Sequence, residues 1–192
     1  MSGKGILEIR WHGRGGQGAK TAAQLLAETA MDEGKYIQAF PEYGPERAGA
    51  PIKAFTRISD EPINLHCGVS NPQIVVVIDP TLLDAVDVAE GIPEDGILLV
   101  NSDQSPQVLR QKLNFRKGKV YTLDATKVAL ETVGLPLPNT PMLGALLKAA
   151  DLVSLNKIED KLTEKFLKKI GEKKTKGNIE SVRRAYNEVQ AG

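Results

Sequence analysis

The sequence Gly-Arg-Gly-Gly-Gln-Gly occupies Gly13–Gly18, hereafter the glycine loop, between an apolar run at 6–11 and an alanine-rich run at 19–31. Gly13, Gly15 and Gly18 fit the spacing G-x-G-x-x-G at a strand-to-helix turn. Glycine there permits positive φ, which we expect at Gly15, and lets a ligand approach the backbone. The helix that follows presents free N–H groups and the positive end of its dipole to an anion. The leading candidates for a ligand site are therefore Gly13, Arg14, Gly15, Gly16, Gln17 and Gly18.

Length and composition indicate an ordinary globular protein. The chain has 192 residues, of which 41% are hydrophobic and 26% charged, and its formal net charge is +1. We expect a single domain over residues 1–192, with a helical C-terminal extension over about 157–192. The basic residues of that extension are interspersed with acids and accompanied by few aromatics, so no nucleic-acid partner is expected.

The single cysteine, Cys67, limits the redox and metal chemistry of this chain. It excludes an internal disulfide framework and a cysteine-ligated iron–sulfur or zinc site. A lone cysteine also fits a reducing cytoplasm. The first five residues lack the apolar core of a signal peptide, and no run approaches the ~18 apolar residues of a membrane helix, so we expect a cytoplasmic protein without a membrane partner. His12 and His66 have no partners at ligand spacing, so no metal site is expected.

Apolar patterning predicts strands and helices in alternation. The run Ile74–Ile78 is almost continuous and β-branched, which is typical of a strand buried on both faces of a parallel sheet. Further strands are expected at 5–11, 36–40, 52–59, 97–100 and 119–123, and helices at 16–33, 80–89, 106–113, 125–133, 142–154 and twice after 157. This order predicts an α/β fold: a Rossmann-like, mostly parallel open sheet flanked by helices, with extra C-terminal helices.

Two segments rich in proline and glycine, at 41–51 and 134–141, interrupt the pattern. The first combines two carboxylates, an arginine and a tyrosine in a stretch that predicts irregular structure. Long loops between strands are often functional, and a plain connector is the alternative.

The glycine loop by itself would suggest a dinucleotide site. The NAD version also requires an acidic residue at the end of the second strand, where it binds the ribose hydroxyls. The strand expected at 36–40 contains none, since Glu33 precedes it on the helix and Glu42 lies beyond Pro41. Arg14 adds a positive charge that suits a phosphate or a carboxylate without specifying a dinucleotide. A structural turn that binds nothing is the alternative.

Other polar residues have a simpler interpretation. Asp79, Asn101 and Asp124 each follow a predicted strand, where capping of the next helix is the favoured role. His12 lies beside the glycine loop and could either donate to an anion or serve the structure. Cys67 is expected to behave as a small hydrophobe. No Ser/His/Asp arrangement or acid–base pair is recognisable, so the catalytic residues stay unknown.

Three motifs, in this order, resemble those of the gamma subunits of the 2-oxoacid:ferredoxin oxidoreductases, and the resemblance covers nearly the whole chain. They are the glycine loop with Ala19, then Tyr43-Gly44-Pro45-Glu46-Arg47 with Gly49-Ala50-Pro51, and then Asn139-Thr140-Pro141-Met142-Leu143-Gly144-Ala145. Many gamma subunits carry a second arginine after the one that matches Arg47, where this chain has Ala48. By this resemblance the candidates for a phosphate-bearing ligand or a subunit contact also include Tyr43, Gly44, Pro45, Glu46, Arg47 and Asn139.

The resemblance implies an enzyme subunit that is inactive alone. Such enzymes convert a 2-oxoacid and coenzyme A to an acyl-CoA and carbon dioxide, and they pass electrons to ferredoxin. Thiamine diphosphate with Mg and the iron–sulfur clusters belong mainly to other chains, so no cofactor is expected on this chain alone, and coenzyme A is a substrate. The implied partners are the alpha, beta and delta subunits, with ferredoxin as the electron acceptor of the complex.

Three functions stay open at this point. The first is the gamma subunit of a pyruvate enzyme, with 2-oxoisovalerate, 2-oxoglutarate or indolepyruvate as alternative substrates, because the pocket that selects the side chain is expected on other chains. The second is a stand-alone NAD(P)-binding Rossmann oxidoreductase. The third is a non-catalytic nucleotide-binding module.

Overall fold

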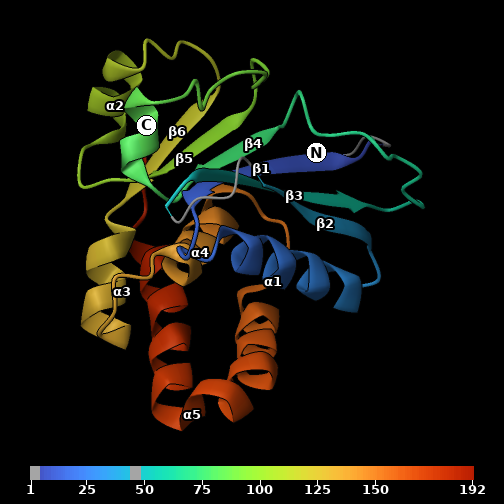
Figure 1. Cartoon of the computed structure of the whole chain (residues 1–192), viewed down its shortest axis with the longest axis vertical. Coiled ribbons are helices and arrows are strands. Elements are labelled where there is room, and N and C mark those ends of the chain that lie inside the picture. The colour runs from blue at the N-terminus through green and yellow to red at the C-terminus, as the bar shows by residue number, and fades with distance from the viewer. Residues whose placement is uncertain (1–4, 44–48) are drawn as a thin grey trace.

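The computed structural model describes residues 5–43 and 49–192, which form one sheet with helices on both faces (Figure 1). In these residues the sheet has seven strands in the order β2-β3-β1-β4-β5-β6-β7. The elements in chain order are β1 (Leu7–Arg14), α1 (Ala19–Asp32), β2 (Tyr36–Tyr43), β3 (Pro51–Ser59), β4 (Ile74–Val77), the 3-10 helix η1 (Pro80–Asp84), β5 (Ile97–Asn101), α2 (Pro106–Lys112), β6 (Lys119–Leu123), α3 (Ala125–Val133), α4 (Asn139–Ala149), α5 (Leu155–Glu188) and β7 (Gln190–Ala191).

The centre of the sheet is parallel. β4 pairs in parallel with β1 on one side and with β5 on the other, and β5 pairs in parallel with β6. Every residue of β4 and β5 is buried, which agrees with their continuous apolar sequences. Antiparallel strands flank this core, because β3 pairs with β1 and β2, and β7 pairs with β6. The predicted fold class, a mostly parallel open α/β sheet flanked by helices, is confirmed.

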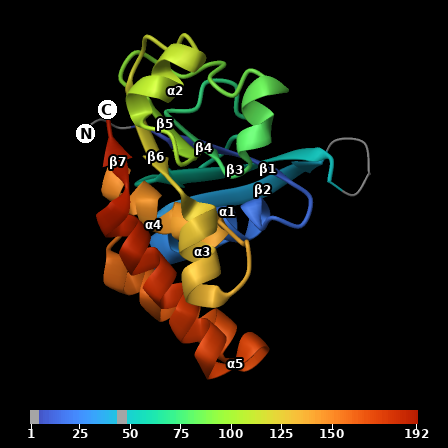
Figure 2. The same ribbon diagram turned by 90° about the vertical axis from the view of Figure 1, so that its left-hand side faces the viewer.

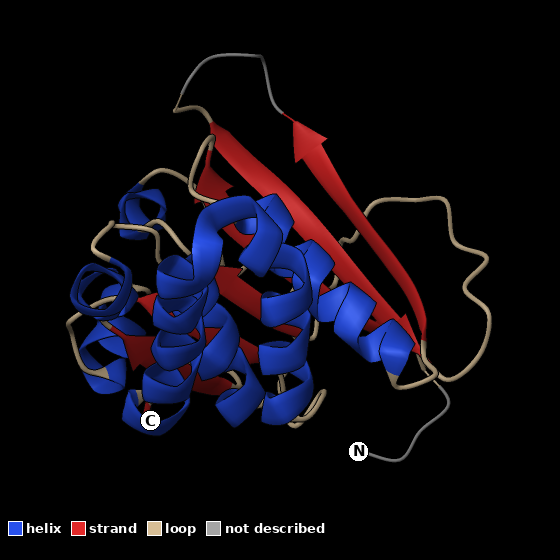
Figure 3. Ribbon diagram, turned by 90° about the horizontal axis from the view of Figure 1, so that it is seen from below, coloured by secondary structure: helices blue, strands red, loops and turns tan. Residues whose placement is uncertain are grey.

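The helices divide between the two faces of the sheet, as the edge-on view shows (Figure 2). One face is covered by α1, α3, α4 and α5, which form the larger apolar core with alternate residues of the strands. Figure 3 shows these helices gathered against the sheet. The other face carries η1 and α2, with a smaller core that includes Leu82 and Leu109. The glycine loop connects β1 to α1 and therefore lies at the edge where the parallel strands end.

Small side chains let α1 lie close to the sheet. Ala19, Ala22, Ala23 and Ala30 are each at most 2% exposed. Gly34 follows the helix with a φ of 83°, the left-handed conformation that commonly ends helices. Alanine therefore sets the distance between the glycine loop's helix and the strands.

The C-terminal segment α5 projects away from the sheet in Figures 1 and 2. Gly171 has a φ of 80° and a ψ of 168°, so it divides the segment into two helices. This agrees with the two amphipathic helices predicted after residue 157. Shortly after α5, β7 pairs with the edge of the sheet at β6, a short strand that the sequence pattern did not predict.

The second strand is not a neighbour of the first. β1, α1 and β2 follow one another at the distance expected of a βαβ unit, but β3 lies between β1 and β2 and pairs antiparallel with both. The cause is the connection from β2 to β3, which returns the chain beside β1 as a hairpin. The end of β2 is therefore one strand further from the glycine loop than in a dinucleotide-binding fold.

Several boundaries also differ. β1 continues through Gly13 to Arg14, and β2 and β3 extend into the segment predicted to be irregular. Pro41 is tolerated in β2 because this strand lies at the edge of the sheet. α4 begins at Asn139 rather than Met142, since Pro141 lies in its first turn, where a missing N–H costs nothing. The helix expected at 80–89 is only the short η1.

Within residues 5–43 and 49–192, no helix combines the length and the apolar character needed to cross a membrane.

Candidate functional site

The glycine loop turns the chain sharply from β1 into α1. Gly16 and Gly18 have φ values of 92° and 79°, a region that favours glycine. Gly15 does not have a positive φ, so our expectation for that position is wrong, and the left-handed residues are its neighbours. Gly18 is also the N-cap of α1, and no side chain caps this end of the helix. The loop therefore leads directly into the uncapped N-terminus of a helix.

Backbone contacts hold the loop against the neighbouring connection. The Gly15 N–H donates to the Ala50 carbonyl over 3.2 Å, and the Gln17 N–H donates to the Arg14 carbonyl over 3.1 Å. The Gln17 side chain closes the turn, because its Oε1 accepts from the Arg14 N–H at 2.7 Å. The turn is thus shaped by its own side chain as well as by glycine.

The Arg14 guanidinium lies at the surface of this loop. Its Nη1 donates to the Gly49 carbonyl at 3.0 Å, and its Nη2 and Nε donate to the Thr81 hydroxyl at 2.9 and 3.2 Å. Nε is also 3.4 Å from Asp79 Oδ2. The Arg14 side chain is 31% exposed, so solvent or a ligand can reach it. A guanidinium in this position can bind a phosphate or carboxylate by exchanging its neutral partners for the anion.

Asp79 follows β4 and lies behind the loop. Its Oδ1 accepts from both the Thr81 N–H at 2.9 Å and the Thr81 hydroxyl at 2.6 Å, and its Oδ2 accepts from Gln17 Nε2 at 2.5 Å. Burial alone would raise the pKa of this carboxyl, but the hydrogen bonds from Thr81 and Gln17, together with the Arg14 charge, lower it below its ordinary value. Asp79 is therefore ionised at neutral pH.

Asn139 lies beside the glycine loop, although it is far from the loop in the sequence. It is the first residue of α4 and only 8% exposed, and a Cβ at Gly18 would lie 2.6 Å from its Nδ2. The structure thus brings the first and third motifs into contact, with a buried polar amide beside the N-terminus of α1.

The rest of the third motif serves packing. A Cβ at Gly144 would lie 2.3 Å from the Val182 carbonyl oxygen, so this glycine allows α4 and α5 to approach closely. The motif therefore has two separate parts, an amide directed at the glycine loop and a glycine that fixes a helix contact.

The capping roles predicted for Asp79 and Asp124 are confirmed, but the one predicted for Asn101 is wrong, because Ser105 caps the next helix, α2, and Asn101 reaches α3 instead. Asp79 caps η1 through the Thr81 N–H, and Asp124 caps α3 through the Lys127 N–H. Asn101 Oδ1 accepts from the first two N–H groups of α3, those of Ala125 and Thr126. Of these three, only Asp79 also contacts the glycine loop.

The second motif is only partly described. Tyr43 ends β2, but its side chain and all of Gly44, Pro45, Glu46 and Arg47 lie outside the described residues, as does Ala48. Gly49 and Ala50 follow, and both accept hydrogen bonds from the glycine loop or its Arg14. The connection that carries the second motif therefore returns to the glycine loop.

His12 has a structural position in β1. It is 3% exposed, and its Nε2 accepts from Arg10 Nε at 3.0 Å. Burial, and then the charges of Arg10 and Lys53, lower its pKa to about 3, so the imidazole is neutral. Arg10 in turn donates to the carbonyls of Val88 and Glu90. Of the two roles considered for His12, this geometry supports the structural one.

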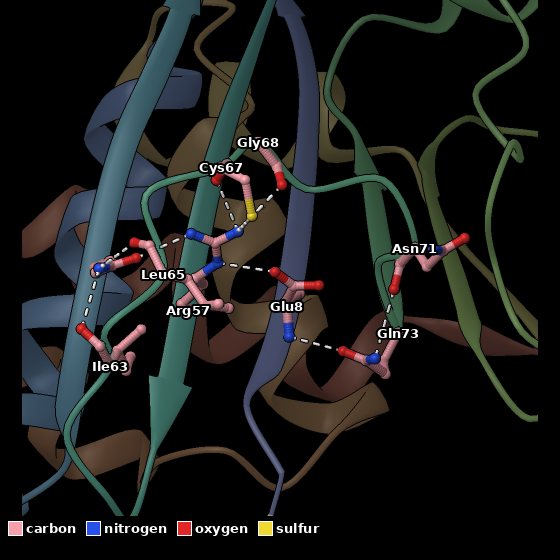
Figure 4. Close-up of polar contacts among 9 residues, drawn as sticks. Glu8, Arg57, Ile63, Leu65, Cys67, Gly68, Asn71 and Gln73 are labelled. Carbon is pink, nitrogen blue, oxygen red and sulfur yellow. Dashed lines mark hydrogen bonds and ion pairs between the residues drawn. The ribbon is translucent and has the colours of Figure 1, made fainter.

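A second polar network, hereafter the Arg57 network, lies on the sheet face opposite α1 (Figure 4). Arg57 is 1% exposed and donates to Glu8 Oε1, to Gln38 Oε1 and to the carbonyls of Cys67 and Gly68. The sequence pattern did not predict this network. The available signal was a pair of opposite charges, Glu8 and Arg57, within two predicted strands.

Cys67 is exposed, which disagrees with the expectation that it behaves as a small hydrophobe, since such a side chain would be packed in the core. The segment that carries it has no regular structure and is held to the sheet through its backbone carbonyls. Among the described residues, no group of three or more His, Cys, Asp or Glu side chains could hold a metal ion.

Comparison with known proteins identifies the family. The model of the family described as pyruvate ferredoxin/flavodoxin oxidoreductase matches residues 8–188. The chain belongs to this family. The match begins in β1 and ends at the last residue of α5, so it includes the glycine loop and Asn139.

Relatives within the pyruvate ferredoxin/flavodoxin oxidoreductase family are similar over almost their full length. The chain is 50% identical to pyruvate synthase subunit PorC of Thermotoga maritima, over 97% of this chain and 96% of the relative. It is 48% identical to the pyruvate/ketoisovalerate oxidoreductases common subunit gamma of Pyrococcus abyssi, over 96% and 98%. The crystal structure of pyruvate oxidoreductase subunit PORC from Thermotoga maritima superposes with a TM-score of 0.87 at 48% identity, covering 97% of this chain and 98% of that one. The resemblance to gamma subunits is thereby confirmed.

Proposed function

We propose that this chain is the gamma subunit of a multi-subunit pyruvate:ferredoxin oxidoreductase, which converts pyruvate and coenzyme A to acetyl-CoA and carbon dioxide and reduces ferredoxin. The observation that carries this proposal is the 50% identity to a pyruvate synthase subunit over nearly the whole of both chains. The chain supplies part of a site and is inactive alone.

The residues of this chain fit a complex in which other subunits hold the cofactors. One cysteine cannot ligate an iron–sulfur cluster that requires several thiolates, so the clusters belong to other subunits. Thiamine diphosphate, with its Mg on another subunit, supplies the carbanion chemistry of the reaction. What this chain offers is a backbone turn, a helix N-terminus, an accessible guanidinium and a buried amide, a set suited to binding and orienting an anionic group.

The proposed role of the glycine loop follows from that set. We infer that Arg14, the N-terminus of α1 and Asn139 bind a phosphate-bearing part of coenzyme A, with residues 43–47 completing the site. The alternative is that the same surface contacts a partner subunit. The uncapped helix end and the 31% exposed Arg14 side chain support the first role, because both are ready to accept an anion.

A second substrate has specific support. The relative from Pyrococcus abyssi is named as a subunit common to pyruvate and ketoisovalerate oxidoreductases. We infer that the pocket that selects the 2-oxoacid lies on other subunits, so this chain could serve a 2-oxoisovalerate enzyme as well. Enzymes for 2-oxoglutarate and indolepyruvate are further alternatives.

Reconstitution tests the proposal. The chain is mixed with the alpha, beta and delta subunits, with thiamine diphosphate, Mg and iron–sulfur clusters intact, and reduction of ferredoxin is followed with each 2-oxoacid. We expect coenzyme A-dependent turnover with pyruvate that disappears when this chain is omitted. Failure of the complete complex to oxidise any 2-oxoacid would contradict the proposal.

A further inference from the structure

Asp79 does more in this structure than cap a helix. It is 6% exposed, and its two carboxylate oxygens have different partners. Oδ1 accepts from the Thr81 N–H and hydroxyl, which is the capping interaction with η1. Oδ2 accepts from Gln17 Nε2 at 2.5 Å and lies 3.4 Å from Arg14 Nε. Capping explains the first oxygen only, and the second is directed entirely at the glycine loop.

Gln17 transmits the position of Asp79 to the backbone of the loop. An ionised carboxylate only accepts hydrogen bonds, so Gln17 must present its NH2 group to Asp79. Its oxygen is then directed at the Arg14 N–H, from which it accepts at 2.7 Å. The low pKa of Asp79 keeps this orientation fixed at neutral pH. One buried carboxylate therefore sets the orientation of the amide that closes the turn.

We propose that Asp79 is a positioning residue, which acts through Gln17 to hold the glycine loop in the shape that binds the phosphate-bearing part of coenzyme A. This inference rests on the proposed function and names the residue that organises its site. Asp79 itself does not touch the ligand.

Because Asp79 is charged, the direction in which Asp79→Asn changes the KM for coenzyme A distinguishes two roles. If Asp79 acted only as a negative charge near an anion site, Asp79→Asn would remove repulsion and lower the KM for coenzyme A. If Asp79 is a positioning residue, the same variant raises that KM, because the NH2 of the introduced asparagine then faces the NH2 of Gln17. Rotation of the Gln17 amide would only move the conflict to the Arg14 N–H.

A double variant restores the hydrogen bonds between residues 17, 79 and the Arg14 N–H and moves the negative charge from position 79 to position 17. In Gln17→Glu/Asp79→Asn, the new carboxylate accepts from both the NH2 of the introduced asparagine and the Arg14 N–H, so every donor again has an acceptor. Gln17→Met removes the link while leaving the Oδ1 contacts of Asp79 with Thr81 in place. Asp124→Asn is the matched control, since Asp124 also ends a strand and caps a helix but does not contact the loop.

The experiment measures steady-state kinetics of the reconstituted complex and hydrogen exchange of the Arg14–Gly18 amides in the full chain. We expect D79N and Q17M to raise the KM for coenzyme A about tenfold, which corresponds to about 1.4 kcal/mol, with kcat little changed. The same two variants speed exchange of the loop amides, Q17E/D79N restores both properties, and D124N changes neither.

Three results would overturn the inference: a KM for coenzyme A that D79N leaves unchanged or lowers, loop exchange that D79N does not alter, or no restoration of the KM and of loop exchange by Q17E/D79N. Failure of the proposed function has a different signature, because the wild-type complex would then lack coenzyme A-dependent turnover. Exchange of the loop amides would still test the positioning role in that case. If D79N does not fold, Q17M carries both measurements.

Discussion

Arg14 and Arg57 lie on neighbouring strands of one sheet, yet they differ in almost every physical respect. Arg57 is 1% exposed, and each of its three nitrogens donates a hydrogen bond, one of them to the carboxylate of Glu8 at 2.8 Å. The Arg14 side chain is 31% exposed and donates to a hydroxyl and a carbonyl, and its only carboxylate neighbour among the described residues, Asp79, is 3.4 Å from Nε. Exposure and hydrogen-bonding partners, rather than residue type, therefore decide which arginine is available to bind a ligand.

The two arginines also have different reasons to stay in place. The Arg57 guanidinium lies 5.4 Å from the centre of the Phe40 ring. It also holds an irregular segment to the sheet through the carbonyls of Cys67 and Gly68 (Figure 4). Its removal would leave these carbonyls and a partly buried carboxylate without a partner. The hydroxyl and carbonyl partners of Arg14 are neutral, so their exchange for water costs little, as the proposed anion site requires.

The largest expected effect is that of Arg57→Met on stability. The substitution keeps much of the side-chain volume but leaves Glu8 and the carbonyls unpaired, so we expect the free energy of unfolding to fall by about 3–5 kcal/mol. Urea denaturation of the chain measures it. Arg57→Lys, which keeps the charge but not the fork of donors, should lose less. A loss below about 1 kcal/mol for R57M would show that the Arg57 network is not structural.

The Arg10–His12 pair lies on the same face as Arg57 and predicts a pH effect. His12 has a pKa of about 3 in the folded chain, and burial is the main cause. An unfolded histidine titrates near pH 6.5, so only the unfolded state takes up this proton between those values. Neutral, buried His12 therefore costs no stability above about pH 6.5. As the pH falls from about 6.5 toward 3, the free energy of unfolding decreases by up to about 1.4 kcal/mol per pH unit.

Denaturation at several pH values between about 4.5 and 7 measures this contribution, and His12→Gln should remove it from the slope. Gln offers an oxygen that can accept from Arg10 in place of the imidazole nitrogen. His66→Gln, at an exposed histidine, is the control for the substitution itself. An unchanged slope in H12Q would mean that His12 is not buried in the neutral form.

Three glycines of the loop form a graded series for alanine substitution. Gly18→Ala should be the most harmful, because it combines a φ of 79° with a contact to the Asn139 side chain. Gly16→Ala is the matched control, with a φ of 92° and open space, and should cost about 1–2 kcal/mol of backbone strain. Gly15→Ala should have little effect, since its Cβ would lie 3.7 Å from its nearest neighbour, the Gly49 nitrogen.

Thermal unfolding measures the series, and kinetics of the reconstituted complex show whether the order also holds for the KM for coenzyme A. Equal losses for G18A and G16A would mean that Asn139 yields freely and is not fixed beside the loop.

Much of this architecture could be predicted because its signals are local. The run Ile74–Ile78 is apolar throughout, so a strand buried on both faces follows from the sequence, and strand-end residues such as Asp124 predict helix caps. The exact order of strands could not be predicted in the same way. The sequence of residues 51–59 does not indicate that this strand lies between β1 and β2, because tertiary contacts determine which strands are neighbours in a sheet.

Individual residues of the candidate site could be predicted, but the hydrogen bonds that connect them could not. Glycine spacing identified the loop, and the motif resemblance identified Asn139. The link between Asp79 and Gln17 could not be derived, because the two side chains that share this hydrogen bond are 62 positions apart in the sequence. Arg57 was missed for a related reason: a charged residue in a strand usually points to solvent, and only the fold covers it.

The most direct test compares Arg14→Ala with R57M in the same two assays, the free energy of unfolding of the chain and the KM for coenzyme A of the reconstituted complex. We expect R14A to change the free energy by less than about 1 kcal/mol and to raise the KM about tenfold. R57M should lower the free energy of unfolding several times more than R14A does, and it should leave the KM for coenzyme A unchanged if the complex still assembles. A KM that R14A does not alter, or an R14A stability loss equal to that of R57M, would contradict the distinction between a ligand-binding and a structural arginine.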